Sequence, residues 1–354
     1  MTKIHNYYLN LAFQLAEKNL GHTGLNPCVG SVVVKNGSVI SSGVTSINGR
    51  PHSESNALKK IKNCSGATLY TTLEPCTHQG KTPPCVNIIA KKKIKKVFYA
   101  FEDPDIRTFK KAKKFLNSKG IQTKLIHIKR YSKFYESYFY NKKFSVPFIT
   151  GKIAISKDSF TIDKQNKWIT NKVSRKIVHL IRNKYDCIIS TSKSINYDNS
   201  LLNCRINGLQ NNKPDLIIID LNLRIKKKLL LNKLLKKRKT YLITYKNNSI
   251  KSMIYKKIGF KIILVNQLKS KKDFNLLFKK IYKIGYSRVL IETGLTFLNN
   301  LLTQKIINKL YIFKSNKNLG KNGKNNATNK YIKRISPILL TKNLNGDRLF
   351  KKDF

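Results

Sequence analysis

Residues 52–54 read His-Ser-Glu, and residues 74–85 read Glu-Pro-Cys-Thr-His-Gln-Gly-Lys-Thr-Pro-Pro-Cys. The two stretches supply one imidazole, from His52, and two thiols, from Cys76 and Cys85. One histidine and two cysteines leave the fourth position of a tetrahedral zinc ion open to water, which is the ligand count of a catalytic zinc rather than a structural one. Zinc lowers the pKa of its bound water, so a hydroxide nucleophile becomes available near neutral pH. The two stretches therefore predict a zinc-dependent hydrolytic site.

Glu54 is the candidate acid–base residue of this site. Because the fourth zinc position must stay open, we expect Glu54 to carry protons from the attacking water to a leaving amine and not to bind the metal. The order His-x-Glu, then Pro-Cys and a later Cys, is typical of zinc-dependent nucleobase deaminases.

The spacing of the cysteines is unusual, because eight residues separate Cys76 from Cys85 where two are common in such deaminases. A longer loop can still return its second thiolate to the metal. The loop contains His78, a rival zinc ligand, although a flexible segment with Gly80 favours a role for His78 near the substrate. The alternative interpretation is two unrelated cysteines and a surface histidine.

Length and composition limit the class of protein. A chain of 354 residues exceeds one ordinary domain and predicts two. No run of about 18 apolar residues occurs, so no membrane span is expected. The first residues lack the apolar core of a secretion signal, and six cysteines in so long a chain do not make a disulfide framework. These features predict a cytoplasmic protein.

The chain is strongly basic. Lys and Arg number 71 against 17 Asp and Glu, which gives a formal net charge of +54 at pH 7. Such a balance alone favours a nucleic-acid partner. The lysines are nevertheless spread through every segment, and no basic stripe carries the interleaved aromatic residues that stack on bases. A proteome-wide bias toward Lys, Asn and Ile codons explains the composition equally well, so we expect no specific nucleic-acid partner.

Helical and strand patterns alternate along the first 145 residues. Helices are predicted at 6–20, 52–62, 84–92 and 109–118, and strands at 31–35, 39–43, 68–73 and 97–101. Asn36-Gly37 predicts a tight hairpin turn between the first two strands. The alternation is typical of a three-layer α/β domain with its active residues at the strand ends.

A second alternation follows a connecting helix predicted at 131–145. It comprises a helix at 172–182 and strands at 146–155, 187–190, 216–219, 240–244, 261–265 and 288–291. The predicted domains are therefore 1–145 and 146–354. Parallel strands with helical crossovers suit a nucleotide cofactor, but no Gly-x-Gly-x-x-Gly motif names one.

The motifs of the first domain resemble the deaminase half of the bifunctional riboflavin-biosynthesis deaminase/reductase family. They are residues 26–30 (Asn-Pro-Cys-Val-Gly), 52–54 and 74–85, the last with the long cysteine spacing of that family. The resemblance implies a cytidine-deaminase-like three-layer fold with Zn2+ bound by His52, Cys76 and Cys85, and with Glu54 as the catalytic proton carrier.

The same resemblance assigns substrate contacts to Asn26, His78 and Lys81. Lys81 stands where Arg is commoner and could hold a phosphate as a point charge, and the alternative is a solvated loop lysine. Residues 103–108 (Asp-Pro-Asp-Ile-Arg-Thr) lack the Gly-Lys-Gly that usually follows the Asp-Pro of this family.

The resemblance continues through the second half, on residues 152–156 (Lys-Ile-Ala-Ile-Ser), 168–170 (Trp-Ile-Thr) and 292–294 (Glu-Thr-Gly). It implies a dihydrofolate-reductase-like α/β domain that uses NADPH. Carried over by position, the cofactor contacts are Ala154, Thr161, Trp168, Ser194, Asp198 and Gly294. The substrate contacts are Asn166, Arg182, Leu202, Arg205 and Glu292.

Chemistry supports part of these assignments, and the sequence also departs from the family in this half. Arg182 and Arg205 suit a phosphate, and Glu292 suits sugar hydroxyls. Ser159 and Thr293 stand where glycine is usual, and Asn308-Lys309 replaces Asp-Glu. Because Thr293 resists both the backbone conformations and the close approach of a phosphate that glycine admits, weaker NADPH binding is expected.

The resemblance therefore implies a bifunctional enzyme of riboflavin biosynthesis. Its substrate would be a pyrimidine ribosylamine phosphate, deaminated by the zinc site and then reduced by NADPH from the ribosyl to the ribityl form. A homo-oligomer, a dimer or a tetramer, is expected, with no membrane partner. Two alternatives stay open: a nucleic-acid base deaminase, and a deaminase whose reductase domain is degenerate.

Overall fold

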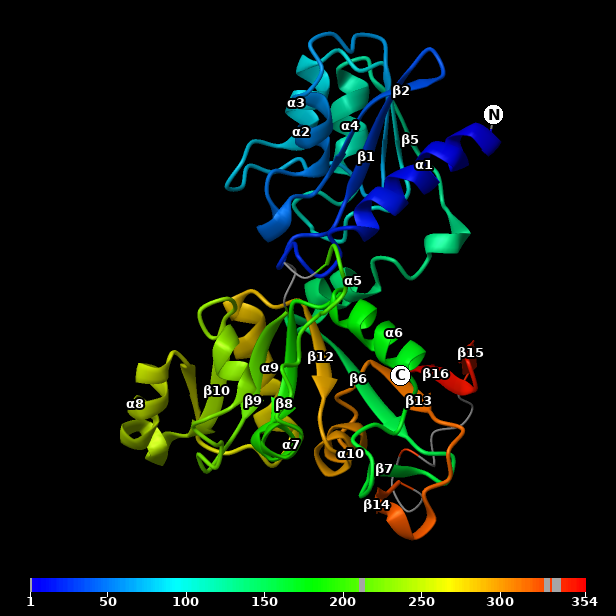
Figure 1. The fold of residues 1–354 in the computed structure, drawn as a ribbon. Helices are drawn as coiled ribbons and strands as arrows, with labels where there is room; N and C mark the ends of the chain where they lie inside the picture. The colour runs from blue at the N-terminus through cyan, green and yellow to red at the C-terminus, as the bar shows by residue number, and fades with distance from the viewer. Residues whose placement is uncertain (1, 210–213, 328–331, 333–338) are drawn as a thin grey trace. The chain divides into compact units, whose positions relative to one another are not determined.

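The computed structural model describes residues 2–209, 214–327, 332 and 339–354, and it divides into two compact units, Met1–Ser145 and Val146–Phe354 (Figure 1). Both units are α/β, as the sequence predicts. Among the described helices, none has both the length and the apolar character needed to cross a membrane.

The first unit is built on a sheet with the strand order β2-β1-β3-β4-β5. The strands are β1 (Gly30–Lys35), β2 (Ser38–Val44), β3 (Thr68–Thr71), β4 (Lys96–Tyr99) and β5 (Gln122–Leu125). β1 is antiparallel to β2 and β3, whereas β3, β4 and β5 are parallel. The predicted turn between β1 and β2 is confirmed, because Asn36 and Gly37 both have positive φ, 49° and 77°, as a two-residue type I′ turn requires.

Helices cover both faces of this sheet and complete the three layers (Figure 1). One face packs against α1 (Thr2–Glu17) and α5 (Glu136–Phe144), and the other against α2 (Ser53–Leu58), α3 (Cys85–Lys91) and α4 (Lys111–Ser118). Strand β1 supplies both cores: Val32 and Val34 face α1, and Val33 faces α2. This is the period of two that a strand imposes on its side chains.

The sequence placed several helix ends wrongly. The helix predicted at 52–62 begins at Ser53 and ends at Leu58, because its buried face ends there: Leu58 is fully buried, while Lys59 and Lys60 are exposed. The helix predicted from residue 109 begins at Lys111, because Lys110 has a left-handed φ of 58°.

The second unit is built on a nine-stranded sheet, counted over the described residues, with the order β11-β10-β9-β8-β12-β6-β13-β16-β15. Its strands are β6 (Phe148–Ile155), β8 (Cys187–Thr191), β9 (Asp215–Ile219), β10 (Thr240–Tyr245), β11 (Lys261–Val265), β12 (Arg288–Glu292), β13 (Lys309–Lys314), β15 (Leu339–Leu344) and β16 (Asp347–Asp353). The strands from β11 to β13 are parallel to one another, whereas β16 is antiparallel to both of its neighbours, β13 and β15. A separate pair joins β7 (Phe160–Asp163) to β14 (Gly323–Asn326).

The order in which strands are added to the sheet reverses between the parallel strands β8 and β12. From β8 it runs through α7 (Ser192–Asp198) to β9, and from β12 it runs through α10 (Leu295–Thr303) to β13 on the other side. Ile195 of α7 and Leu298 of α10 belong to cores on opposite faces of the sheet. Open parallel sheets bind ligands beyond the strand ends at such a switch point.

Other helices complete both layers of this unit. α6 (Lys172–Arg182) and α8 (Ser249–Ile258) lie on the face of α7, and α9 (Lys271–Ile284) lies on the face of α10. The sequence patterns predicted α6 but not the other helices of this unit.

Candidate active sites

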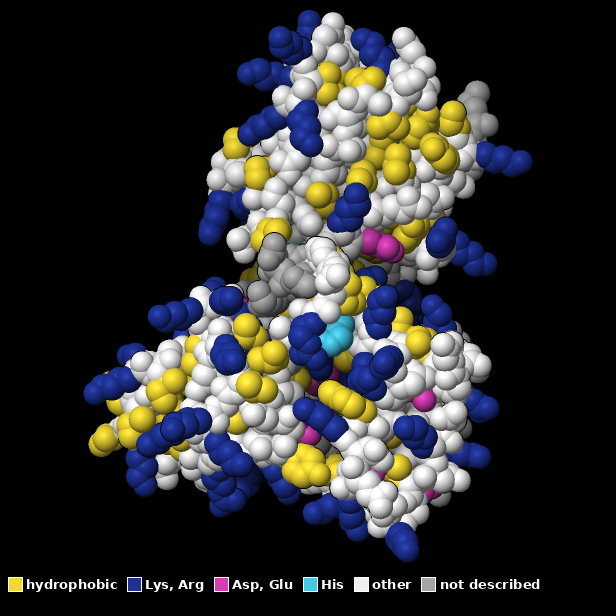
Figure 2. Space-filling view, viewed as in Figure 1, with side chains coloured by type: hydrophobic (Ala, Val, Ile, Leu, Met, Phe, Trp, Pro, Cys, Tyr) yellow, Lys and Arg dark blue, Asp and Glu magenta, His cyan; other side chains and the backbone are white. Residues whose placement is uncertain are grey.

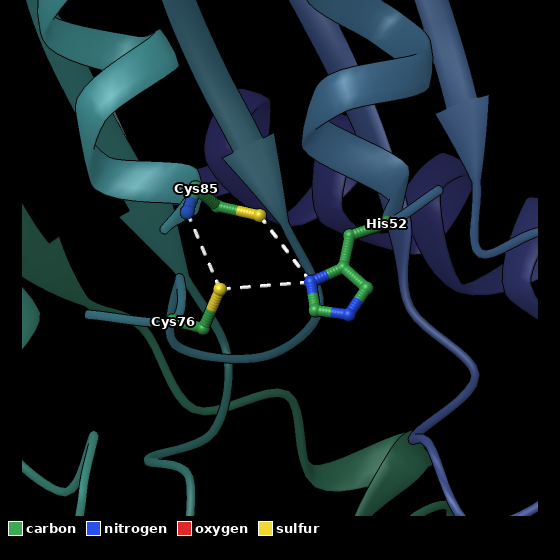
Figure 3. Close-up of side chains that lie close together, drawn as sticks. All are labelled: His52, Cys76 and Cys85. Carbon is green, nitrogen blue, oxygen red and sulfur yellow. Dashed lines mark hydrogen bonds between the residues drawn. The ribbon is translucent and has the colours of Figure 1, made fainter. Parts of the chain in front are cut away.

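Three elements bring the metal donors together in the first unit (Figure 3). His52 precedes α2 as its N-cap residue, Cys85 opens α3, and Cys76 lies in the loop that follows β3. His52 Nδ1 lies 3.5 Å from Cys76 Sγ and 3.4 Å from Cys85 Sγ. All three donor atoms lie within 4.8 Å of one another. One nitrogen and two sulfurs converging in this way fit a zinc ion with an open fourth position.

The electrostatics of the donors favour a thiolate at Cys76, whereas the hydrogen bond with Cys76 and burial raise the pKa of Cys85. Hydrogen bonds from Cys85 and His52 lower the pKa of Cys76 to about 4, although burial opposes them. The Cys85 backbone N–H also donates to Cys76 Sγ, at 3.2 Å. A thiolate is the form of cysteine that binds metal.

His78 is not part of the donor cluster found among the described residues. Its Nδ1 lies 3.1 Å from Thr108 Oγ1, and the neighbouring Thr77 Oγ1 donates to the Arg107 carbonyl at 2.9 Å. These contacts join the loop after Cys76 to the segment 103–110.

Glu54 is 3% exposed, and its carboxyl group interacts with the thiols of both Cys76 and Cys85. The Ser53 hydroxyl donates to Glu54 Oε2 at 3.0 Å, and Ser53 Oγ lies 2.8 Å from Ser31 Oγ. Burial, together with the charge of Cys76, raises the pKa of Glu54. A buried carboxyl group with a raised pKa is better suited to hold and return a proton than an exposed one.

A cavity of about 270 Å³ opens beside these groups. Its lining includes six of the seven residues that the sequence singled out in this domain, which are Asn26, His52, Glu54, Cys76, His78 and Lys81. Basic side chains also line it, among them Arg50, Arg107 and Lys142. Four acidic side chains, those of Glu54, Glu74, Asp103 and Asp105, line it too, so the cavity has the size for a small-molecule ligand but its charges do not select an anion.

Glu74 lines this cavity and connects the loop of Cys76 to the segment 103–112. The sequence showed no sign of this structural role beyond the place of Glu74 in the motif. The Glu74 carboxylate accepts hydrogen bonds from three backbone N–H groups, those of Asp103 at 3.2 Å, Lys110 at 3.1 Å and Ala112 at 3.0 Å. It thereby fixes the start of α4 and the segment 103–110 beside Cys76.

The segment that lacks the family's Gly-Lys-Gly forms an ion-pair network of its own. Asp105 accepts from Arg107 Nε at 2.8 Å and Nη2 at 2.6 Å, and from Lys142 Nζ at 2.9 Å. The Tyr138 hydroxyl donates to Asp103 at 3.0 Å. Tyr138 and Lys142 both belong to α5, so this helix supports the rim of the cavity.

A second cluster of charges lies at the carboxyl end of β12. Arg182 holds Glu292 bidentately, with Nε at 2.6 Å from Oε1 and Nη2 at 3.0 Å from Oε2. Lys152 Nζ lies 3.6 Å from Glu292 Oε2. Lys152 was not singled out from the sequence as a site residue; the available signal was a lysine within an otherwise apolar strand.

Burial and charge perturb this cluster. Burial raises the pKa of Glu292, but Arg182 and Lys152 outweigh it and lower that pKa to about 2. Burial lowers the pKa of Lys152, and burial with the charges of Arg182 and Arg205 lowers the pKa of His179 to about 4. Perturbed groups of this kind often mark functional sites.

The residues carried over as substrate contacts divide into two groups. Near Glu292, the Asn203 carbonyl accepts from Arg182 Nη1 at 3.1 Å, and Arg205 Nη1 donates to Asn203 Oδ1 at 2.8 Å. Because two nitrogens of the Arg182 guanidinium already bond to Glu292, Arg205 is the more available of the two arginines for a phosphate. Leu202 is buried, with a left-handed φ of 45°. Asn166 instead donates to Asp163 Oδ2 at 3.0 Å, after β7.

Some of the predicted cofactor contacts meet at the switch point. The Gly294 N–H donates to Ser194 Oγ at 3.0 Å, where α10 and α7 begin. Asp198 ends α7, and burial raises its pKa while Lys152 opposes that rise.

The other predicted cofactor contacts have neighbours of their own. Thr161 donates to the Asn325 carbonyl at 3.2 Å. Trp168 is 49% exposed, with the Arg175 guanidinium 4.9 Å from its ring centroid. Ala154 packs against the cluster around Phe313.

The two substituted glycine positions differ. Ser159 has a left-handed φ of 72°, a conformation that favours glycine. Thr293 is not among the described residues with positive φ, so its backbone does not require glycine, and that part of the expectation is wrong. Its hydroxyl lies 3.2 Å from Thr191 Oγ1. Weaker NADPH binding stays a prediction.

Comparison with protein families gives two matches. Residues 147–340 match the RibD C-terminal domain, and residues 2–101 match the cytidine and deoxycytidylate deaminase zinc-binding region. The chain is 32% identical to riboflavin biosynthesis protein RibD of Aquifex aeolicus over 326 residues, which cover 90% of this chain and 88% of the relative. It is 33% identical to RibD of Buchnera aphidicola, over 89% and 87% of the two chains.

Two solved structures are similar to this chain over 99% of its length. RibD of Acinetobacter baumannii has 25% identity and a TM-score of 0.84, over 99% of both chains. The diaminohydroxyphosphoribosylaminopyrimidine deaminase/5-amino-6-(5-phosphoribosylamino)uracil reductase of Thermotoga maritima has 25% identity and a TM-score of 0.80, over 99% and 98% of the two chains.

Proposed function

The chain belongs to the RibD family of riboflavin biosynthesis proteins, and from that membership we propose a role for each residue of its two sites. It is a bifunctional enzyme, a zinc hydrolase that deaminates and an NADPH-dependent oxidoreductase. The single observation that carries the assignment of residues is the convergence of His52, Cys76 and Cys85 beside the buried Glu54.

In the first reaction, the substrate is 2,5-diamino-6-(5-phosphoribosylamino)pyrimidin-4-one. His52, Cys76 and Cys85 would hold the zinc ion, which when bound supplies a nucleophile at neutral pH by lowering the pKa of a water molecule. Glu54 would take a proton from the attacking water and return it to the departing ammonia. Its burial and raised pKa support both halves of that cycle.

The same cavity orients the pyrimidine. The Asn26 amide suits the edge of the ring, because it offers both a donor and an acceptor. His78 and Lys81 stand in the loop beside the metal donors, and Lys81 suits the ribose phosphate.

In the second reaction, the ribosyl group is reduced to ribityl, and NADPH when bound supplies the hydride. The switch point beside Ser194 and Gly294 is the place for the cofactor, with Asp198 at the end of the same helix. Ala154, Thr161 and Trp168 complete the proposed cofactor contacts.

The substrate of the reductase lies toward the charged cluster in this proposal. Glu292 accepts hydrogen bonds from sugar hydroxyls while Arg182 keeps it ionised. Lys152 can donate a proton or a hydrogen bond to the oxygen or nitrogen that gains charge during reduction. Arg205, with Leu202 and Asn166, completes the substrate contacts, and Arg205 takes the phosphate.

The alternatives are less well supported. A nucleic-acid base deaminase would leave residues 147–340 unexplained. Figure 2 shows Lys and Arg side chains scattered over the visible face of each unit, without one continuous stripe. A degenerate reductase would have no need of the buried cluster formed by Lys152, Arg182 and Glu292. The cytoplasmic location and the homo-oligomeric state stay predictions.

The test compares substrates and a metal-ligand variant. Wild-type protein should release ammonia from the diaminopyrimidinone ribosylamine phosphate, and oxidise NADPH with the deaminated product, but should not deaminate cytidine or a single-stranded oligonucleotide. Cys85→Ala should lose bound zinc and ammonia release while NADPH oxidation persists. Ammonia release from the oligonucleotide, or none from the pyrimidine, would refute the proposed substrate.

A further inference from the structure

A buried arginine, Arg238, lies outside the Glu292 cluster and outside every motif of the family resemblance. It is 7% exposed and follows the short helix Leu230–Leu234, just before β10. A buried guanidinium needs acceptors for its donors, because leaving them unpaired away from water is costly.

The acceptors of Arg238 are backbone carbonyls of residues 201–202 and of Pro214, which bond to its two terminal nitrogens, whereas Nε has no acceptor among the described residues. Nη1 donates to Leu202 O at 2.6 Å and to Pro214 O at 3.2 Å, and Nη2 donates to Leu201 O at 2.5 Å. Leu202 has a left-handed φ of 45°, which leucine rarely adopts. The conformation of segment 201–203 therefore depends on contacts from outside it.

The other side of this segment faces the charged cluster. The Asn203 carbonyl accepts from Arg182 Nη1 at 3.1 Å and lies 2.9 Å from His179 Nδ1. Asn203 Oδ1 accepts from Arg205 at 2.8 Å. Segment 201–205, which includes Arg205, thus lies between the buried Arg238 and Arg182, the arginine that pairs with Glu292.

We propose that Arg238 is a positioning residue of the reductase site, which holds segment 201–205 so that Arg182 and Arg205 meet the phosphorylated pyrimidine substrate in the correct geometry. The inference rests on the proposed function of this unit. Arg238 bonds to segment 201–205 and not to Ser194 or Gly294, which meet at the proposed cofactor site. Replacing Arg238 should therefore weaken binding of the substrate and not of the cofactor.

The experiment uses the full chain and the variants Arg238→Lys and Arg238→Met. We expect the KM for the deaminated pyrimidine to rise between about tenfold and a hundredfold, since a small displacement of positioning groups has effects of this size. The Kd for NADPH and the ammonia release of the other unit should change by less than about twofold. The fluorescence of Trp168, the only tryptophan, reports whether this unit is folded.

Arg288→Lys is the matched control. Arg288 donates from Nε to the Lys184 carbonyl at 2.9 Å, but it stands at the amino end of β12, the end opposite to Glu292. The KM of the Arg288→Lys variant for the deaminated pyrimidine should match that of the wild type. If Arg238→Met does not fold, Arg238→Lys decides the question.

The outcomes separate the inference from the proposed function. A wild-type chain that oxidises no NADPH would overturn both. An active wild type whose Arg238→Lys variant keeps its KM, or loses NADPH and pyrimidine binding equally, would overturn the positioning role alone. A fall in apparent kcat at unchanged KM would also overturn that role, because it would mean only a smaller folded fraction.

Discussion

Glu292 is a buried carboxylate whose charge depends on two neighbouring cations. Its pKa in the folded protein is about 2, below the ordinary value of 4.5, because Arg182 and Lys152 outweigh the effect of burial. A carboxyl group with a lowered folded-state pKa stabilises the fold above its unfolded-state pKa. That stability is lost as pH falls from about 4.5 toward about 2.

Replacing Glu292 with Gln should therefore remove a pH-dependent contribution to stability. The shift corresponds to about 3 kcal/mol at neutral pH, of which about 2 kcal/mol should be lost between pH 4.5 and pH 3. Urea unfolding followed by Trp168 fluorescence measures the difference between wild type and variant. A difference that stays constant from pH 6 to pH 3 would contradict the lowered pKa.

Ser159 tests a different residue-level effect, the cost of a side chain at a left-handed φ. Glycine adopts the φ of 72° without a steric penalty, although it also loses more entropy on folding. Ser159→Gly should therefore stabilise the second unit by up to about 1 kcal/mol. Ser159→Ala keeps the Cβ atom and should give no gain. Equal stability of the two variants in urea would argue against backbone strain at this position.

The two sites differ in how far the sequence predicted them. The donors His52, Cys76 and Cys85 belong to short motifs with a fixed ligand chemistry, so their convergence could be predicted. The family resemblance assigned Arg182 and Glu292 to one substrate site, but it predicted neither their ion pair, which joins residues 110 positions apart, nor Lys152 as a partner of Glu292. Arg238 carries no motif, and its contacts are to backbone carbonyls that any residue type could supply.

At the scale of elements, α9 shows how local signals fix a helix end. Ser270 and Asp273 form a reciprocal capping box, in which Ser270 Oγ accepts from the Asp273 N–H and Asp273 accepts from the Ser270 N–H at 2.8 Å. Glycine at residue 285, with a φ of 114°, ends the helix.

Ser270→Ala should destabilise the second unit by about 1 kcal/mol, because it removes the side-chain acceptor for the Asp273 N–H. Lys272→Ala, an exposed change within the same turn, is the control and should have little effect. Unfolding in urea, followed by Trp168 fluorescence, compares the two. Equal losses would show that the cap does not stabilise this helix end.

Helices and strands were predicted best where an apolar run or an apolar period in the sequence coincides with residues that are buried in the structure. The strands of the parallel sheet up to β12 are apolar runs and were recognised. β13 begins at Lys309, and β16 has only two apolar residues, Leu349 and Phe350, among five charged ones, so neither stood out. The end of α2 was misplaced because the helix ends where its core contacts end and not where helix-forming residues end.

At the scale of the whole molecule, two units with separate cores carry two separate chemistries. The metal donors and Glu54 belong to the first unit, and the charged cluster and the switch point belong to the second. Each activity therefore serves as an internal control for variants of the other unit. The net charge of +54 belongs to both and predicts only salt-sensitive, non-specific binding of polyanions.

The most direct test of this division is a single variant, Glu54→Gln, assayed for zinc content, ammonia release and NADPH oxidation. We expect bound zinc to be retained, ammonia release from the pyrimidine to fall by at least about a hundredfold, and NADPH oxidation with the deaminated substrate to match that of the wild type. Ammonia release at the wild-type rate would contradict the role of Glu54 as the proton carrier, and loss of both activities would contradict the independence of the two sites.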